Sequence, residues 1–459
     1  MGIHGLHKGG VLLEVVFHPT GAHLLLENLP GVRTIAVGFW IKIGSRQEHE
    51  DEAGIAHLLE HMVFKGTKKR SGKDIALIFD RLGGDVNAYT TKEYTAFVGR
   101  FLPEHLAEGT ALLLEMISAP KCKDEELRRE REVILEELAQ VSDDPVEVVH
   151  DLGEALFFGE HPLARPIIGR EETIQRMTCS KLCAFWHAHY RPENLVVVLV
   201  GALDSNVVGP IYEIIDNTLK RWAQRHQEDS PSTLLFAKNP QLDVASDETT
   251  PMFHSTVYDA SMIHANEWTR TDDRYKRINW PDLAQSHLLY VFPGLPFGHP
   301  DMPILSVLNT MLGGSMSSRL YQVLREEEGL VYDVYTDAVY YKDHGYLKLY
   351  AATRSNLEHQ VRGHIQTCLE SIRTKGFRAD EIDLAKETLR SALILASDGP
   401  LGRLEKLGVY GVYGMNVDHL EDEIERLMRV QLEDVHRLLQ IMLAHSPVLA
   451  IVGREPADA

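Results

Sequence analysis

Cysteine and positive charge are both in short supply in this sequence. The 459 residues include 4 cysteines whose spacing matches neither a zinc ribbon nor a redox motif, so we expect a reducing compartment. Cys179 and Cys183 lie four residues apart on an expected helix, and we assign them to core packing. Lysine and arginine number 47 against 67 aspartates and glutamates, a formal net charge of −20. This balance argues against binding to nucleic acid or to anionic membranes.

Long apolar runs are also absent. The longest, "NLVVVLVGAL" at 194–203, has the length of a strand and is too short to cross a membrane. The first ten residues do not combine a basic stretch with an apolar one, so no signal peptide is expected. We therefore expect a cytoplasmic protein that does not insert into membranes.

Strand and helix patterns alternate along the chain, whose length indicates more than one domain. Residues 31–45 alternate and are rich in β-branched and aromatic side chains, which predicts a strand. Residues 71–84 begin with a serine cap and end in a glycine pair, which is typical of a helix. Residues 85–101 follow as two strands or one bent strand, and 123–141 are strongly helical.

The second half of the chain repeats features of the first half. A helix followed by an apolar strand ends at Gly201 and again at Gly453, and a Leu-Gly-Gly helix end recurs at 82–84 and 312–314. Several matches in the same order predict two copies of one unit. The predicted parts are a first domain at residues 1–225, a linker with an inserted element at 226–275, and a second homologous domain at 276–459.

The stretch "GIAHLLEHMVFKGT" at 54–67 carries a cluster of chemically active side chains. His57 and His61 are four apart, so a helix places both imidazoles on one face, and Glu60 projects close to the same point. The two imidazoles can bind one metal ion, while Glu60 can serve as a ligand or activate a water. The competing interpretation is an exposed polar face with two ordinary histidines.

A catalytic zinc needs a third protein ligand and one open position. The helix expected at 123–141 offers many carboxylates, and a helical wheel separates them. Glu130 and Glu137 lie two turns apart at the edge of its apolar stripe, whereas Glu136 points to solvent. Glu130 and Glu137 are therefore the pair that can reach a buried site. The alternative is that both are boundary charges on a solvated helix.

These segments resemble the family of pitrilysin, insulin-degrading enzyme and mitochondrial processing peptidase, whose members carry the inverted zinc motif His-x-x-Glu-His. The similarity extends from "GSRQEHEDEAGIAHLLEHMVFKGT" to "GGDVNAYTTKEYT", "HPLARPIIG" and "LNTMLGGSMSSRLYQVLREEEGLVYDVYT". It covers residues from about 10 to 225 and from about 275 to 455. The chain is similar to the short two-domain members, of bacterial type or like the β subunit of the processing peptidase.

The resemblance implies a role for each matching residue of the zinc site. One zinc ion per chain is implied, bound by His57, His61 and Glu137. Glu60 corresponds to the general base of the family, and Glu130 to a glutamate that supports the site. The implied chemistry is attack on a peptide carbonyl by a water that zinc and Glu60 activate together.

Two further pairs of residues match the family. Asn87 and Ala88 correspond to the strand that receives the substrate, and Arg325 and Tyr332 to the pair that stabilises the oxyanion. Each also has an ordinary structural interpretation. Asn87 suits a turn or strand end, Arg325 a solvated helix, and Tyr332 a simple strand.

The implied fold is α+β, with two homologous αβ domains. Each is a mostly antiparallel sheet packed with helices, and together they form half of a clamshell chamber. The implied function is a zinc endopeptidase that hydrolyses unfolded peptides or processes precursor segments, as a homodimer or as a heterodimer with a related chain. The net charge of −20 favours basic, unstructured peptides as substrates, and the alternative is that it serves solubility alone. The alternative is a non-catalytic structural or partner subunit of a related heterodimeric complex.

Overall fold

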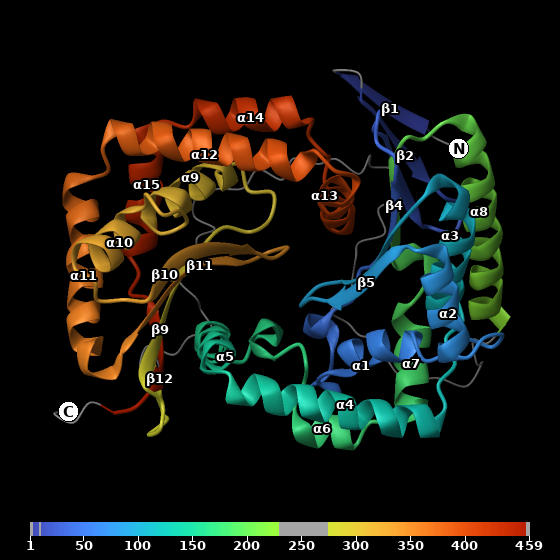
Figure 1. Ribbon diagram of the computed structural model, residues 1–459, viewed down its shortest axis with the longest axis horizontal. Helices are drawn as coiled ribbons and strands as arrows, with labels where there is room; N and C mark the ends of the chain where they lie inside the picture. Colours follow the sequence, from blue (N-terminus) through green and yellow to red (C-terminus); the bar gives the residue numbers. More distant parts are fainter. Residues whose placement is uncertain (1–2, 9–10, 229–273, 456–459) are drawn as a thin grey trace. The chain divides into compact units, whose positions relative to one another are not determined.

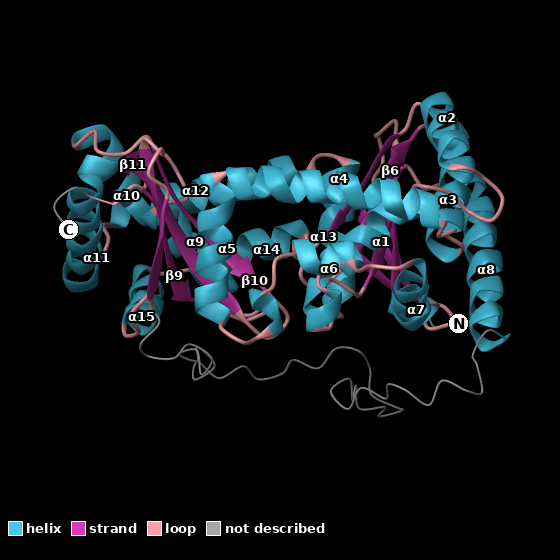
Figure 2. Cartoon of the chain, turned by 90° about the horizontal axis from the view of Figure 1, so that it is seen from below, coloured by secondary structure: helices cyan, strands magenta, loops and turns pink. Residues whose placement is uncertain are grey.

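The computed structural model describes residues 3–8, 11–228 and 274–455 (Figures 1 and 2). Their contacts divide the chain into two compact units, and each unit combines segments from both halves of the sequence. The first unit comprises the described residues within 1–135, 167–228 and 397–417, and the second comprises those within 136–166, 274–396 and 418–455.

The first unit is built on a seven-stranded sheet. Its strands are β1 (Ile3–Lys8), β2 (Val11–Phe17), β3 (His23–Asn28), β4 (Ile35–Ile41), β5 (Asp85–Thr90), β6 (Thr95–Phe101) and β7 (Leu195–Gly201). They are arranged in the order β1-β2-β3-β7-β4-β6-β5, and all neighbours are antiparallel except β3 and β7. Strands β4 and β7 are buried along their whole length, as expected of central strands covered on both faces.

Helices cover both faces of this sheet. They are α1 (Ile55–Val63), α2 (Gly72–Leu82), α3 (Pro103–Ser118), α6 (Glu171–Gln175), α7 (Cys179–His189), α8 (Ser205–Glu228) and α13 (Pro400–Tyr413). Helix α13 packs on the face that carries Trp40, and its Gly408 leaves the space that the indole occupies. A Cβ atom at Gly408 would lie 2.1 Å from the Trp40 ring, so only glycine allows this close approach.

The second unit contains a five-stranded sheet in the order β10-β11-β9-β12-β8. These strands are β8 (Tyr275–Asn279), β9 (Gln285–Pro293), β10 (Asp333–Tyr340), β11 (Gly345–Arg354) and β12 (Val448–Gly453). Its helices are α5 (Pro145–Phe158), α9 (Met302–Leu312), α10 (Arg319–Tyr321), a π-helix (Gln322–Glu327), α11 (Glu358–Lys375), α12 (Ala379–Ser397), α14 (Leu420–Arg429) and α15 (Leu432–Leu443). None of the helices in the described part of the chain is long and apolar enough to cross a membrane.

Short 3-10 turns and one long helix connect these elements. The turns are Ser45–Gln47, Glu50–Glu52, Pro162–Ala164, Pro192–Asn194 and Ser355–Leu357. The long helix is α4 (Asp124–Asp143), whose first half contributes Leu127 and Ile134 to the core of the first unit. It continues to Asp143, just before α5, which packs on β9 and β12 of the second unit.

The two sheets share one topology. The order β3-β7-β4-β6-β5 in the first unit matches β8-β12-β9-β11-β10 in the second. In each sheet the first two of these strands are the parallel pair. This match confirms the prediction of an α+β fold with two copies of one mostly antiparallel unit. The domain limits at 225 and 276 stay predictions, because residues 229–273, which hold most of the proposed linker and its inserted element, lie outside the described residues.

A disulfide links two parts of the first unit that are distant in sequence. Cys122, just before α4, is bonded to Cys179, the first residue of α7, with their Cα atoms 5.7 Å apart. Cys179 also packs against the core, as predicted, but Cys183 is exposed, so its assignment to core packing is wrong. The sequence analysis missed the disulfide because a separation of 57 residues does not reveal which segments meet. The bond also runs against the expectation of a reducing compartment, since disulfides are rare there.

Candidate metal centre

Two features of helix α1 orient the two histidines: one face of the helix is buried in the core, and its N-terminus is capped by a carboxylate. Leu58, Leu59 and Met62 are buried in the core of the first unit, which leaves His57 and His61 half-buried on the opposite side. At its N-terminus the buried carboxylate of Glu48 accepts hydrogen bonds from the backbone N–H groups of residues 54 and 56, both at 2.9 Å. A carboxylate at this position satisfies free N–H groups and complements the helix dipole.

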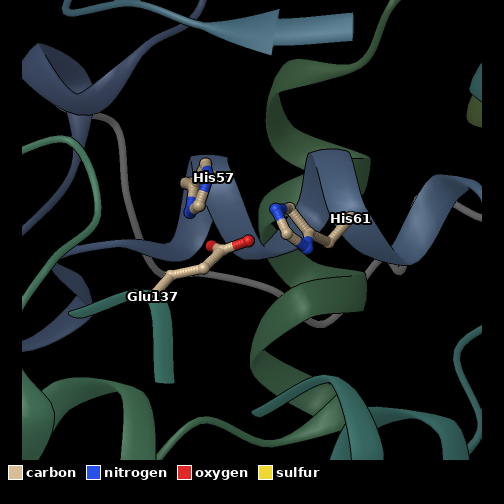
Figure 3. Close-up of side chains that lie close together, drawn as sticks. All are labelled: His57, His61 and Glu137. Carbon is tan, nitrogen blue, oxygen red and sulfur yellow. The ribbon is translucent and has the colours of Figure 1, made fainter. Parts of the chain in front are cut away.

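His57, His61 and Glu137 form a compact donor group (Figure 3). One ligand atom from each residue lies within 4.8 Å of the other two, and the carboxylate of Glu137 points toward both imidazoles. Among the described residues this is the only group of three or more histidine, cysteine, aspartate or glutamate side chains that meets this condition. Two imidazoles and one carboxylate are a donor set that catalytic zinc uses.

The protonation of His57 also suits metal binding. Burial, with a smaller electrostatic contribution from His61, lowers the pKa of His57 to about 4. Its buried Nδ1 atom has no hydrogen-bond partner among the residues that the structure describes. A neutral imidazole with a free nitrogen is the form that binds a metal, so the residues present fit a zinc ion.

Glu130 forms a hydrogen bond with His61. It is 4% exposed, and its carboxylate lies 2.9 Å from Nδ1 of His61 and 2.6 Å from Nζ of Lys65. Burial alone would raise the pKa of Glu130, but the hydrogen bonds from His61 and Lys65 outweigh it and the pKa is lowered. Because a carboxylate only accepts, Nδ1 of His61 carries the proton and Nε2 is left for a metal.

The burial of the glutamates on α4 agrees with the helical wheel. Glu130 is buried and Glu137 half-buried, whereas Glu136 is exposed. Glu60 is 8% exposed and accepts a hydrogen bond of 2.6 Å from the hydroxyl of Thr90. Glu60 is not a member of the donor group formed by His57, His61 and Glu137, so its role stays a prediction.

Asn87 and Ala88 lie on β5, which ends the order of the seven-stranded sheet. They pair with Val98 and Phe97 of β6, and Asn87 is exposed. Within the described residues no strand pairs with the other side of β5. A free strand edge of this kind can accept an extended peptide through its backbone groups.

Arg325 and Tyr332 contact each other in the second unit. The guanidinium carbon of Arg325 lies 5.0 Å from the ring centroid of Tyr321 and 5.9 Å from that of Tyr332, within the range of cation–π attraction. Arg325 belongs to the π-helix Gln322–Glu327, a rare element that is frequent at functional sites. Tyr332 is 75% exposed, so it contributes little to the core.

Sequence reasoning missed the roles of Glu48, which caps α1, and Thr90, which contacts Glu60. Both lie in segments that carry the family resemblance, "GSRQEHEDEAG" and "NAYTTKEYT". For Thr90 a signal was available, because alternation along β5 puts it on the same face as Ala88. For Glu48 no local pattern showed that its carboxylate would cap α1.

Two repeated αβ units, one of which carries the two histidines of a His–His–Glu group of the kind that catalytic zinc uses, can be compared with known proteins. The insulinase family, peptidase family M16, matches residues 23–171, and the peptidase M16 inactive domain matches residues 176–389. The chain belongs to the M16 peptidase family, which confirms the resemblance inferred from the sequence motifs.

Its relatives support this assignment. YmxG of Bacillus subtilis, an uncharacterized zinc protease, is 32% identical over 94% of this chain and 96% of its own length. An uncharacterized zinc protease of Streptomyces coelicolor is 31% identical over 98% of this chain and 91% of its own length. The crystal structure of a peptidase M16 inactive domain from Pseudomonas fluorescens shares the fold, with a TM-score of 0.80 and 21% identity over 97% of this chain and 99% of that one.

Proposed function

We propose that this protein is a zinc-dependent endopeptidase that hydrolyses unfolded peptides, with one zinc ion per chain bound by His57, His61 and Glu137. The observation that carries the proposal is a donor group suited to zinc beside a buried glutamate, Glu60, that the group does not use. The zinc protease names of the relatives support the same activity.

Each residue of the centre has a part in the proposed reaction. Zinc, when bound, supplies a Lewis acid that polarises the scissile carbonyl and acidifies a water. Glu60 accepts the proton of the attacking water and returns it to the leaving nitrogen. Glu130 keeps His61 in the tautomer that has Nε2 available. Tyr332, with Arg325 beside it, donates to the developing oxyanion.

The proposed substrate is an extended peptide that pairs with the free edge of β5 beside Asn87 and Ala88. Backbone pairing tolerates many side chains, which suits hydrolysis of varied unfolded chains or precursor segments. We further propose that the chain works as a homodimer or as a heterodimer with a related chain, enclosing a chamber. The net charge of −20 favours basic peptides.

The alternative function is a non-catalytic partner subunit. The match to an inactive domain favours it only for residues 176–389, and none of the three proposed zinc ligands lies there. The complete donor group in the preceding part of the chain favours the catalytic proposal.

The test compares three glutamine variants for zinc content and for cleavage of an unstructured peptide. Glu60→Gln removes the base but no ligand, so it keeps its zinc and loses about 10²- to 10⁴-fold in kcat. Glu137→Gln removes a ligand and loses zinc. Glu136→Gln, an exposed change on the same helix, keeps both properties. A zinc-free Glu60→Gln protein, or a zinc-loaded wild type without peptidase activity, contradicts the proposal.

A further inference from the structure

Thr90 contacts the proposed base directly. It is the last residue of β5, and its hydroxyl donates a hydrogen bond of 2.6 Å to Oε2 of Glu60. Glu60 is 8% exposed, so few water molecules can compete for this oxygen. A hydrogen bond from a hydroxyl to a buried carboxylate is stronger than one between two neutral groups.

The position of Thr90 follows from the alternation of side chains along β5. Val86 and Ala88 pack against the core cluster on the α1 side of the sheet, and Tyr89 packs against the cluster on the other side. Thr90, two residues after Ala88, therefore faces α1 as well. Helix α1 lies beside β5 (Figure 1), and this brings Thr90 to Glu60.

The same strand thus carries two different parts of the centre. Asn87 and Ala88 form the free edge on which we expect the substrate, and Thr90 contacts the residue that we expect to move the proton. A β-branched side chain has few rotamers, so its hydroxyl is a stiff anchor. The hydrogen bond fixes the carboxylate of Glu60 relative to the backbone of β5.

We propose that Thr90 is a positioning residue for peptide hydrolysis, which holds the carboxylate of Glu60 in register with a peptide paired to β5. This inference rests on the proposed function. Thr90 touches neither the metal ligands nor the substrate in this scheme, and it acts only through Glu60. If its hydroxyl served stability alone, its loss would lower the melting temperature and leave kcat unchanged.

The experiment uses the full-length, zinc-loaded protein with Thr90→Val and Thr90→Ser. Valine keeps the shape and removes the hydroxyl, while serine keeps the hydroxyl. Thr67→Val is the matched control, because Thr67 donates an equally short hydrogen bond of 2.6 Å to Glu115, which is not in the donor group. Zinc content, melting temperature, kcat, KM and a crystal structure are measured for each variant.

We expect Thr90→Val to keep its zinc and its KM within about twofold and to lose about 10- to 100-fold in kcat, as misplacement of a catalytic group does. Thr90→Ser recovers most of kcat. Thr67→Val lowers the melting temperature without changing kcat. In crystals of the Thr90→Val protein, the carboxylate of Glu60 leaves its wild-type position.

Two results would overturn the inference. One is a Thr90→Val protein with wild-type kcat, and the other is an unmoved Glu60 carboxylate in its crystal structure. The crystallographic result does not depend on turnover. It therefore still decides the role of Thr90 if the wild-type protein proves inactive, which would refute the proposed function instead.

Discussion

Replacing Glu130 by glutamine isolates the contribution of a residue that binds no metal itself. Its carboxylate accepts from Nδ1 of His61 at 2.9 Å and from Nζ of Lys65 at 2.6 Å. Glutamine has nearly the same size and keeps one acceptor oxygen, but it removes the charge and adds an NH₂ group that can face His61. The substitution therefore weakens the preference of His61 for a proton on Nδ1.

The two contacts of Glu130 differ in expected energy. The Lys65 side chain is 35% exposed, so solvent screens this ion pair and it contributes at most about 1 kcal/mol. The contact with His61 sets the orientation and basicity of a metal ligand. Loss of such a partner weakens metal binding about 10- to 100-fold, or about 1.4 to 2.7 kcal/mol. We therefore expect the zinc dissociation constant of Glu130→Gln to rise by that factor.

The assay is a competition titration of zinc against a chromophoric chelator at neutral pH. Glu136→Gln is the control, since it removes the same charge from the exposed side of the same helix. We expect its dissociation constant to stay within about twofold of the wild-type value. A wild-type zinc affinity in Glu130→Gln, or an equal loss in Glu136→Gln, would show that orientation of His61 does not control the site.

Four further substitutions test activity, the disulfide and the pH dependence of stability. Arg325→Ala and Tyr332→Phe should each lower kcat without changing the zinc content, and the loss for Tyr332→Phe should be about 10²-fold. Full activity in both variants would exclude this pair from the mechanism. Thiol titration of unfolded, unreduced protein should find two free thiols, and four would contradict the disulfide. Cys122→Ser should lower the unfolding free energy by about 4 kcal/mol in denaturant titrations, because the bond to Cys179 closes a long loop. Burial lowers the pKa of His150 to about 4, so the unfolded state binds the extra proton between pH 6.5 and 4, and stability falls as the pH falls through this window. This loss amounts to roughly 2 kcal/mol of unfolding free energy between neutral pH and pH 5, and His150→Gln should remove it. A variant whose unfolding free energy falls as steeply with pH as that of the wild type would show that His150 does not cause the loss.

Periodic patterns explain what the sequence predicted well. The 3.6-residue period of α4 sorted Glu130 and Glu137 from Glu136, because which face a helical residue occupies depends only on local geometry. The presence of two copies of one unit was also predictable, since the helix and strand that end at Gly201 recur before Gly453 in the sequence itself. The family motif supplied the rest of the predicted centre, and the structure brings His57, His61 and Glu137 together.

Contacts between distant segments account for what the sequence did not predict. The hydrogen bond from Thr90 to Glu60 and the disulfide from Cys122 to Cys179 each join segments that meet only through tertiary packing. The periodicity of a sequence does not show which distant segments come into contact. Arg325 and Tyr332 were found through the resemblance alone, because an exposed tyrosine and a helical arginine are ordinary in composition.

Helices α5 and α13 each pack on the sheet of the unit that lies mainly in the other half of the sequence. Helix α13 comes from the second half of the sequence and covers the sheet of the first unit, where it contacts Trp40. Helix α5 comes from the first half and covers the sheet of the second unit. We therefore expect a cut within residues 229–273 to yield two fragments that each lack one helical layer and leave an apolar sheet face open to water. The two sequence repeats are not two autonomous folding units, and the halves depend on each other for solubility as well as for fold.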